Sequence, residues 1–447
     1  MAEQFEPRER QESTVPQVAA DGGHAPVQTH RRKPSRALIV VIALIFTVAA
    51  FAAGWFGRYY AIDSHARSFL WMLDAVQKNY REKVDMDELY DKLYDALELD
   101  RFCAHYTPEE YADIVAESKG RNTGYGFSYV EEGERVRLYR VVGNSPAELS
   151  GMKKGMYIFR CNGAEITSSG ELAEALAEGD TAVFECGFSE DGDDKASYEV
   201  TRSSYLASYC RYADSENTFV FRGTKQLVLT EAGAGIAELP ADTAYLSLAE
   251  FDGNAAWEVK TCLQKMKERG RTNLVLDLRS NGGGYLSTLC EISAHFMRNA
   301  KAHNPLVTSV RYRSGKTLKY RATGNDFGSY FNADSRISVL ADENSASASE
   351  CLLGVLVDYG TVSYSDIYLR QDDKGVARTY GKGVMQAHFT APDGNVMRLT
   401  VADVFWPKGN NIHEVGVTKA DGAIGIKADR IWGARDEMLL EVCSRLA

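Results

Sequence analysis

Three short segments in the second half of the chain carry residue types that could catalyse a reaction. Residues 344–350 read Asn-Ser-Ala-Ser-Ala-Ser-Glu, residues 380–386 read Tyr-Gly-Lys-Gly-Val-Met-Gln, and residues 276–284 read Leu-Asp-Leu-Arg-Ser-Asn-Gly-Gly-Gly. A hydroxyl, an amine and exposed backbone N–H groups are the parts from which a nucleophile, a general base and an oxyanion site can be built.

The serine segment lies between a predicted strand and a predicted helix at 348–359. A hydroxyl there would stand beside unpaired N–H groups at the positive end of the helix dipole, which could stabilise an oxyanion. The alternative is an ordinary helix N-cap, which is the commoner role of serine at this position. These local features do not choose among Ser345, Ser347 and Ser349.

Lys382 stands between two glycines, so backbone can approach it closely from either side. To act as a general base it must be neutral, which requires burial to lower its pKa. Gln386 follows four residues later and could orient the amine. The alternative is a surface lysine in a turn. The glycine run at 282–284 is read either as an anion-binding turn or as a flexible connection. Three further residues are set aside: His413 as structural, Asp358 as solvated and Arg279 as a partner for a carboxylate.

The elements that must position these residues alternate between strand and helix. Residues 206–447 contain predicted strands at 243–248, 273–278 and 337–340, and predicted helices at 255–267, 286–297 and 348–359. Such alternation favours an α/β fold with a mainly parallel sheet and helices on its faces. Residues 119–205 combine short strands with glycine turns and predict a compact β-rich domain. Residues 58–118 predict a helical lead-in, with helices at 68–80 and 86–99 and a capping box at Thr107.

Residues 37–57 carry no charge and would span about 31 Å as a helix, enough to cross a bilayer. A basic cluster precedes them, which predicts a cytoplasmic N-terminus and an extracytoplasmic catalytic part. The alternatives are a cleaved signal peptide and a buried core helix. Residues 1–36 predict a disordered cytoplasmic tail.

The formal net charge of −11 argues against a nucleic-acid-binding protein. The eight cysteines form no C-x-x-C pair, which argues against a zinc site. Both disulfides and buried free thiols are compatible with their spacing.

In their order along the chain, the glycine run, Ser-Ala-Ser-Ala-Ser-Glu and Gly-Lys-Gly-x-x-Gln resemble the carboxy-terminal processing peptidases, also called tail-specific proteases. The resemblance extends over nearly all of residues 64–420. It implies that Ser347 is the nucleophile, that Lys382 is the base and that Gln386 assists it. It also implies that the backbone N–H groups of Gly283 and Ala348 bind the oxyanion.

The same resemblance implies that residues 119–205 form a PDZ-like domain. Its Gly124, Tyr125, Gly126 and Phe127 would bind a free C-terminal carboxylate. Two departures stand out: Gly282 replaces the usual proline of the family, and the segment at 364–378 is longer than usual.

The uncharged segment at 37–57 and the resemblance together predict a membrane-anchored, single-pass serine endopeptidase that recognises the free C-terminal tails of extracytoplasmic proteins. No metal or organic cofactor is expected. A homodimer through the lead-in helices is compatible with the sequence, as is their packing within one chain. Two alternatives are a catalytically inactive, membrane-tethered peptide-binding scaffold and a Ser-Lys hydrolase for non-peptide substrates.

Overall fold

The computed structural model describes residues 44–51, 53, 54, 57, 63–81, 83–97, 99–177, 179–223, 226–230, 235–428 and 436–446. The predicted tail at 1–36 lies outside these residues, as does much of the predicted membrane segment at 37–57, of which residues 44–51 are helical. Within the described ranges, no helix has both the length and the apolar composition that crossing a bilayer requires. The chain divides into two compact units, residues 1–89 and 90–447.

The unit at 1–89 contains the helix α2 (Ser64–Asn79), which starts where the Asp63 carboxylate accepts the N–H of His65 at 2.8 Å. Its apolar side chains Phe69, Leu70 and Met72 are exposed. The helix α3 (Met86–Asp95) begins in this unit and continues into the next. Both helices were predicted from the sequence, although α3 is shorter than expected.

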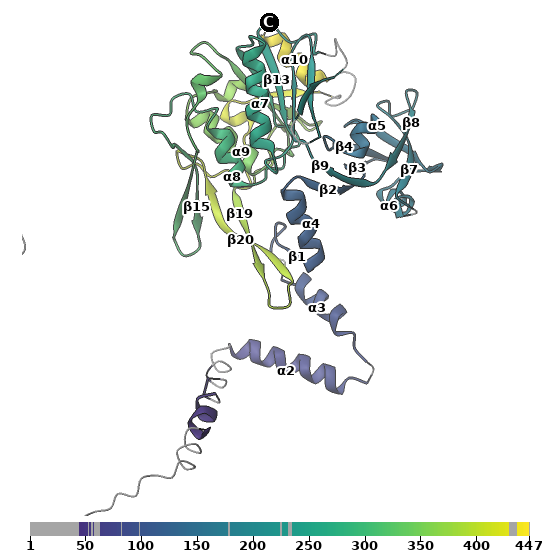
Figure 1. The fold of residues 1–447 in the computed structure, drawn as a ribbon, viewed down its shortest axis with the longest axis vertical. Coiled ribbons are helices and arrows are strands. Elements are labelled where there is room, and N and C mark those ends of the chain that lie inside the picture. Colours follow the sequence, from purple (N-terminus) through teal and green to yellow (C-terminus); the bar gives the residue numbers. More distant parts are fainter. Residues whose placement is uncertain are drawn as a thin grey trace, which may run out of the picture. The chain divides into compact units, whose positions relative to one another are not determined.

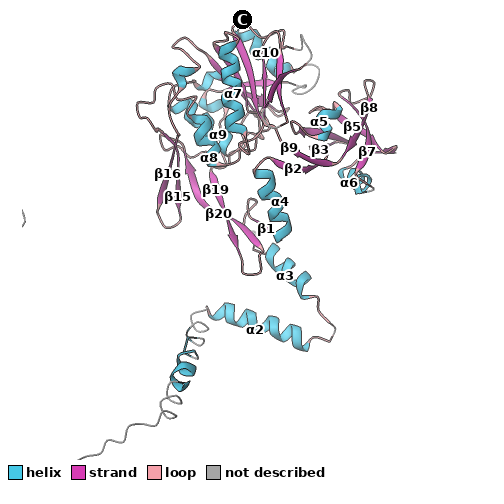
Figure 2. Ribbon diagram, viewed as in Figure 1, coloured by secondary structure: helices cyan, strands magenta, loops and turns pink. Residues whose placement is uncertain are grey.

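The core of residues 90–447 is an eight-stranded sheet, in the order β12-β11-β10-β13-β14-β17-β18-β21. Figures 1 and 2 show helices such as α7 and α9 packed against this sheet. The pairs from β13 to β21 are all parallel and the remaining pairs are antiparallel, which confirms the predicted mainly parallel sheet. The strands are β10 (Cys210–Ala213), β11 (Thr218–Arg222), β12 (Gln226–Leu229), β13 (Thr243–Leu248), β14 (Asn273–Asp277), β17 (Ile337–Ala341), β18 (Ile367–Gln371) and β21 (Ile424–Lys427).

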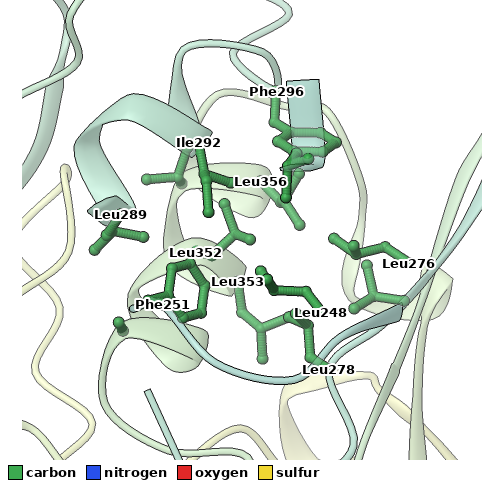
Figure 3. Packing of buried hydrophobic residues seen from close by; sticks show 14 of the residues in the cluster. Leu248, Phe251, Leu276, Leu278, Leu289, Ile292, Phe296, Leu352, Leu353 and Leu356 are labelled. Carbon is green, nitrogen blue, oxygen red and sulfur yellow. The ribbon is translucent and has the colours of Figure 1, made fainter. Parts of the chain in front are cut away.

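Helices cover both faces of this sheet because successive side chains of a strand point to opposite sides. Leu274 and Leu276 of β14 belong to the large core formed with α7, α8 and α9, whereas Val275 between them packs in the core that contains α10. Figure 3 shows leucines of β13 and β14 facing those of α8 and α9. The helices are α7 (Ala255–Glu268), α8 (Leu286–Ser293), α9 (Ala348–Asp358) and α10 (Glu437–Leu446).

Parallel strands bring their carboxyl ends to one edge of a sheet, where open α/β proteins bind ligands. The turn at 278–285 leaves β14 at this edge, and the turn at 342–347 leaves β17 beside it. Two of the three candidate segments therefore meet for topological reasons.

A second, antiparallel sheet was not predicted. It has the order β1-β20-β15-β16, with β19 on the other side of β20. Its strands are β1 (Ala104–Tyr106), β15 (Leu306–Tyr312), β16 (Thr317–Arg321), β19 (Val384–Thr390) and β20 (Val396–Phe405). The segment at 364–378, which is longer than usual in the family that the sequence resembles, contains the core strand β18 followed by a turn.

The β-rich module, residues 119–205, contains a sheet in the order β3-β4-β5-β7-β8, with β6 paired to β5. Fourteen buried residues form its own core. Among the described strands, β3 and β8 form the two edges of this sheet. The elements are α4 (Pro108–Ser118) before it, then β2 (Arg121–Gly124), β3 (Phe127–Glu132), β4 (Arg135–Val141), α5 (Pro146–Ser150), β5 (Tyr157–Cys161), β6 (Ala164–Glu165), α6 (Ser169–Ala177), β7 (Thr181–Gly187), β8 (Ala196–Thr201) and β9 (Ser203–Leu206). The predicted capping box at Thr107 is present at α4.

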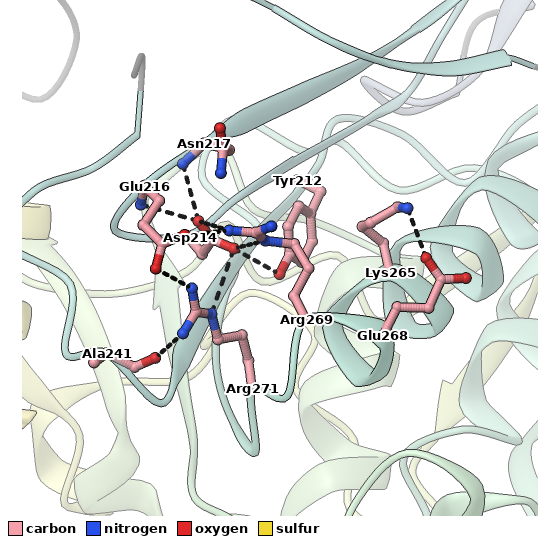
Figure 4. Close-up of polar contacts among 9 residues, drawn as sticks. All are labelled: Tyr212, Asp214, Glu216, Asn217, Ala241, Lys265, Glu268, Arg269 and Arg271. Atoms are coloured by element: carbon pink, nitrogen blue, oxygen red, sulfur yellow. Dashed lines mark hydrogen bonds and ion pairs between the residues drawn. The ribbon is translucent and has the colours of Figure 1, made fainter. Parts of the chain in front are cut away.

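A charged cluster fastens the end of α7 to the turn after β10 (Figure 4). Asp214 is fully buried and is paired with both Arg269 and Arg271. Glu216 accepts from the same two arginines, at 2.7 and 3.0 Å. Asp214 follows the β10 residue that pairs with Tyr245 near the start of β13, so the cluster lies at the edge opposite the turns at 278–285 and 342–347.

All eight cysteines lie within the described residues and are free and buried. Of the two predicted alternatives, the structure therefore has buried free thiols and not disulfides.

Candidate active site

The turn between β17 and α9 holds Ser347 in a backbone conformation that L-amino acids rarely adopt, with φ 57° and ψ −113°. Such conformations cost about 1–3 kcal/mol and cluster at functional sites. Ser347 immediately precedes α9, so it lies at the positive end of a helix dipole. A sharp strand-to-helix turn of this kind is how hydrolases present a nucleophilic serine.

The three serines of the segment differ in their surroundings. Ser345 is fully buried and donates its hydroxyl to the carbonyl of Leu278 at 2.8 Å. Ser349 is also fully buried and donates to the carbonyl of Asn281 at 2.9 Å. Ser347 is partly exposed. The two neighbours are thus committed to structural hydrogen bonds, which leaves Ser347 as the accessible hydroxyl.

Glu350 joins the serine turn to the lysine segment. Its Oε2 accepts the backbone N–H of Ser347 at 3.0 Å and that of Lys382 at 2.9 Å. Its Oε1 accepts the N–H of Gly381 at 2.7 Å and the hydroxyl of Thr379 at 2.6 Å. Burial raises the pKa of Glu350, and these four hydrogen bonds oppose the shift. Sequence reasoning gave Glu350 no role, although its place three residues after Ser347 in the first turn of a helix was a usable signal.

The amine of Lys382 is half-buried and its Nζ lies 5.0 Å from the centroid of the Phe102 ring. Burial lowers the pKa of Lys382, and the positive charge of Arg398 lowers it further. The negative charges of Glu350 and Asp100 act in the opposite direction. Together these effects lower the pKa of Lys382 below its ordinary value, which is the direction that a general base requires.

Gln386 lies on β19, in the strand that follows Lys382. Its side-chain amide donates to the hydroxyl of Thr400 at 3.1 Å. Thr400 in turn donates to the Asp100 carboxylate at 3.3 Å. The amide hydrogen bond of Gln386 thus goes to Thr400, and the predicted assistance to Lys382 remains a prediction.

The two predicted oxyanion donors, Gly283 and Ala348, lie side by side. A Cβ added to Gly283 would stand 2.9 Å from the nitrogen of Ala348 and 2.8 Å from the Cβ of Ser347, so only glycine fits there. The φ of Gly283 is 107°, a value that also favours glycine. Its N–H, however, donates to the side-chain oxygen of Asn281 at 2.9 Å. In this structure the Asn281 carboxamide therefore occupies the position of an acceptor that an oxyanion would take.

A cavity of about 720 Å³ opens beside this site between the α/β core and the module. Lys382, Gly282 and Ala346 line it from the core, and Leu138 and Arg140 line it from β4. Its volume lies within the range of typical ligand sites. The cavity is thus lined both by the module and by the segment that carries Lys382.

The module is fastened to the core by an ion pair at the rim of the cavity. Arg140 binds Glu250 through two hydrogen bonds, of 3.0 and 2.5 Å. Next to Glu250, Phe251 donates its N–H to the carbonyl of Gly283 at 2.8 Å. The module is thus connected to the glycine turn through Glu250 and its neighbour Phe251.

The predicted carboxylate-binding loop, at Gly124, Tyr125, Gly126 and Phe127, precedes the edge strand β3. The carbonyl of Tyr125 accepts from Ala147 at 2.9 Å, and that of Gly126 accepts from Val142 at 2.9 Å. In planar trans peptides the next N–H points the opposite way, so the N–H groups of Gly126 and Phe127 face away from these partners. The loop lies some distance along the chain from the other predicted site residues, and no contact of it with Ser347 or Lys382 is among the described interactions.

The residues set aside behave as follows. Arg279 is fully buried and paired with Asp277 and Asp436, as predicted. Asp358 accepts the N–H of Lys408 at 2.7 Å and is partly buried, so it is not simply solvated. The ring of His413 lies 6.4 Å from that of Phe102. In the described part of the chain, no cluster of three or more His, Cys, Asp or Glu residues could hold a metal ion.

Comparison with known proteins gives a consistent family. Residues 242–420 match the description "Peptidase family S41". The carboxyl-terminal-processing protease of a Synechocystis strain is 26% identical over 315 residues, which cover 69% of this chain and 64% of that protein. The carboxyl-terminal-processing protease of a Picosynechococcus strain is 27% identical over 342 residues, covering 74% and 72% of the two chains. The first of these alignments thus spans less than two thirds of the relative.

A solved structure from Bacteroides fragilis, assigned to the S41 proteases, superposes with a TM-score of 0.51. It is 17% identical in sequence and covers 84% of this chain and 97% of its own. At this identity the likeness concerns the fold.

Proposed function

We propose that this chain, whose residues 242–420 match peptidase family S41, is a serine endopeptidase in which Lys382 activates Ser347. The observation that carries the proposal is the shared Glu350 carboxylate, which ties the strained serine turn to the backbone of a half-buried lysine. The lowered pKa of Lys382 is the second support.

The proposed reaction is an acyl transfer in two steps. Neutral Lys382 takes the proton of Ser347, and the serine oxygen attacks the carbonyl carbon of the scissile peptide bond. The protonated amine then gives this proton to the leaving nitrogen, and an acyl-enzyme remains. Water activated by the same amine hydrolyses the ester and restores Ser347. Every proton is thus carried by one lysine, with no metal or organic cofactor.

The tetrahedral intermediate would place its oxyanion at the N-terminus of α9, near the N–H of Ala348. Gly283 would supply a second N–H once the Asn281 carboxamide turns away from it. Gln386 would assist Lys382 indirectly, through its hydrogen bond to Thr400.

The module is proposed to select substrates by their C-terminal tails, as a PDZ-like domain. Strand β3 stands at the edge of its sheet, so an extended peptide can add to it as a further strand. The N–H groups of Gly126 and Phe127 begin this strand and suit a terminal carboxylate. The helix α6 packs beside β3 and would form the other wall of the groove.

Membrane anchoring is proposed from the sequence, through the uncharged segment at 37–57 and the basic residues before it. The N-terminus would lie in the cytoplasm and the peptidase outside it, where it would meet extracytoplasmic proteins. Fractionation of cells that express the full chain, followed by protease accessibility of the intact cells, tests this orientation. Recovery in the soluble cytoplasmic fraction would overturn it.

The activity is tested with the full chain and two peptides of identical sequence, one with a free and one with an amidated C-terminus. Cleavage of the free peptide should be lost in Ser347→Ala and in Lys382→Met, and should be slower for the amidated peptide. Unaltered cleavage in both variants would refute the assignment. Equal rates for the two peptides would refute tail recognition alone.

One observation favours the second candidate function, an inactive peptide-binding scaffold. The N–H of Gly283 is already bound by Asn281, so the oxyanion site is closed as it stands. The scaffold predicts that the free peptide binds with its carboxylate required, and that no cleavage occurs even with excess peptide. Cleavage that depends on Ser347 decides against it.

A further inference from the structure

We propose that Phe102 is a positioning residue for the candidate base, and that its ring covers the Lys382 amine and keeps water from it. The proposal deepens the function above and rests on it, since it assigns a covering side chain to the lysine of that same site. Phe102 belongs to the lead-in before β1, a part of the chain to which the sequence reasoning gave no role in the reaction.

The geometry begins with the ring itself. Its centroid lies 5.0 Å from the Nζ of Lys382, and both residues line the cavity beside the site. The guanidinium of Arg101 lies 4.8 Å from the same ring centroid and 4.9 Å from that of Tyr380. Arg101 therefore joins the lead-in to the segment that carries Lys382.

The backbone around Phe102 is held at three points. The Asp100 carboxylate accepts the N–H of Phe102 at 2.8 Å and that of Cys103 at 3.0 Å. The carbonyl of Phe102 accepts the Nε of Arg398 at 2.9 Å. Directly after this turn, β1 pairs with β20, the strand that carries Arg398. The ring is thus fixed over the amine by the second sheet.

The same turn receives the contact of Gln386. Gln386 donates to Thr400, and Thr400 donates to Asp100. A glutamine that does not bond the amine in this structure is therefore connected to the residue that covers it. Gln386 would therefore influence Lys382 by holding in place the turn that contains Asp100 and Phe102.

Two effects of the ring on the amine have opposite signs. The face of an aromatic ring attracts a cation, which favours the charged amine by less than about one pKa unit at a single phenylalanine. Exclusion of water favours the neutral amine, by as much as about 3–5 units for full burial. Burial is the largest cause of the lowered pKa of Lys382, so exclusion of water is the effect that the proposal assigns to the ring.

The other groups that face Lys382 do not account for the shift alone. Arg398 of β20 lowers the pKa of Lys382, whereas Glu350 of α9 and Asp100 raise it, and burial is the largest cause. Arg101, Tyr380 and His413 surround the ring from the lead-in and from the segments at 380 and 413. The charges partly cancel, so burial of the amine, to which the Phe102 ring contributes, is the main cause of the lowered pKa of Lys382.

The test measures the amine directly as well as the reaction. The full chain is trace-labelled with acetic anhydride across a pH series, and acetylation of Lys382 is followed by mass spectrometry, with the remaining lysines as internal references. Phe102→Ala should raise the pKa of Lys382 by at least one unit, whereas Phe102→Leu, which keeps an apolar cover without a ring face, should leave it low. The control Phe389→Ala removes an exposed ring from β19 and should leave the pKa of Lys382 unchanged.

In peptide cleavage, the rising limb of kcat/KM should move to higher pH in Phe102→Ala, which lowers the rate near pH 7 by about tenfold for each unit of pKa. An unchanged pKa in Phe102→Ala overturns the proposal, and so does a shift in Phe102→Leu as large as in Phe102→Ala. If the pKa of Lys382 responds as expected but no form of the chain cleaves peptide, the proposed function is refuted, whereas the shielding of Lys382 by Phe102 is supported.

Discussion

Ser347 and Lys382 donate their backbone N–H groups to the same carboxylate oxygen of Glu350, at 3.0 and 2.9 Å. The two residues lie on different elements, one before α9 and the other before β19. A single buried side chain therefore sets the distance between the backbones of the candidate nucleophile and the candidate base. This arrangement leads to the predictions below.

Replacing Glu350 with glutamine should impair both folding and activity. An amide in this place turns two donors toward groups that are themselves donors, and buried donors left unpaired cost about 1–3 kcal/mol each. We expect the free energy of unfolding to fall by about 2–4 kcal/mol and kcat/KM to fall by about a hundredfold or more. Urea unfolding and peptide cleavage measure the two effects. The exposed Glu268→Gln on α7 is the control, and equal behaviour of the two variants would contradict the role of Glu350.

The activity should rise with pH through the pKa of Lys382, because only the neutral amine can accept the proton of Ser347. Burial places that pKa below the ordinary lysine value, so the rising limb of kcat/KM should lie below the pH at which an exposed lysine titrates. The contribution of Lys382 to folding stability should also increase with pH. The unfolded chain holds this proton more tightly, so stability from Lys382 increases as pH rises from the folded pKa to the unfolded one. A profile that is flat over this range would contradict the assignment of the base.

Gly283→Ala should abolish activity, whereas Gly282→Ala should not. A methyl group at Gly283 would stand 2.8 Å from the Cβ of Ser347, and its φ of 107° disfavours any side chain. At Gly282 an added Cβ meets nothing within 4 Å. The two variants differ by one position in the same turn and are compared by rates of peptide cleavage and by thermal unfolding. Equal activity of both would mean that this turn does not form part of the reacting site.

Asp214→Asn should lower stability without affecting the chemistry. Burial alone would raise the pKa of Asp214, but hydrogen bonds from Arg269 and from backbone N–H groups lower it to about 2. A lowered carboxylate pKa stabilises the fold above the unfolded value and loses this contribution as pH falls toward the folded one. We expect a loss of about 2 kcal/mol at pH 7 that shrinks between about pH 4 and pH 2.

Denaturant unfolding across this pH range measures the loss in Asp214→Asn. Glu441→Gln, in an exposed pair with Arg445 on α10, serves as the comparison. A difference between wild type and Asp214→Asn that stays constant with pH would contradict the linkage.

Most local structure could be predicted because it depends on neighbours along the chain. The alternation of strand and helix predicted β13, β14, β17 and the helices after them, and Thr107 with Glu110 predicted the start of α4. The order of the serine, lysine and glycine motifs was enough to name the family. The second sheet was missed although β15–β16 and β19–β20 are hairpins of neighbouring strands. Its assembly depends on pairs between distant segments, such as β1 with β20, which no local pattern predicts.

The amino-acid order thus predicted the main strands and helices of the α/β core, the resemblance to the processing peptidases and the candidate residues, through spacing and local preference. The fold decided which of them meet. Only packing shows that Ser345 and Ser349 are buried in structural hydrogen bonds, that Asn281 occupies the N–H of Gly283, and that Phe102 lies over Lys382. The physical reason is that burial and hydrogen bonding between distant segments depend on where the whole chain packs, and no window of neighbouring residues contains that information.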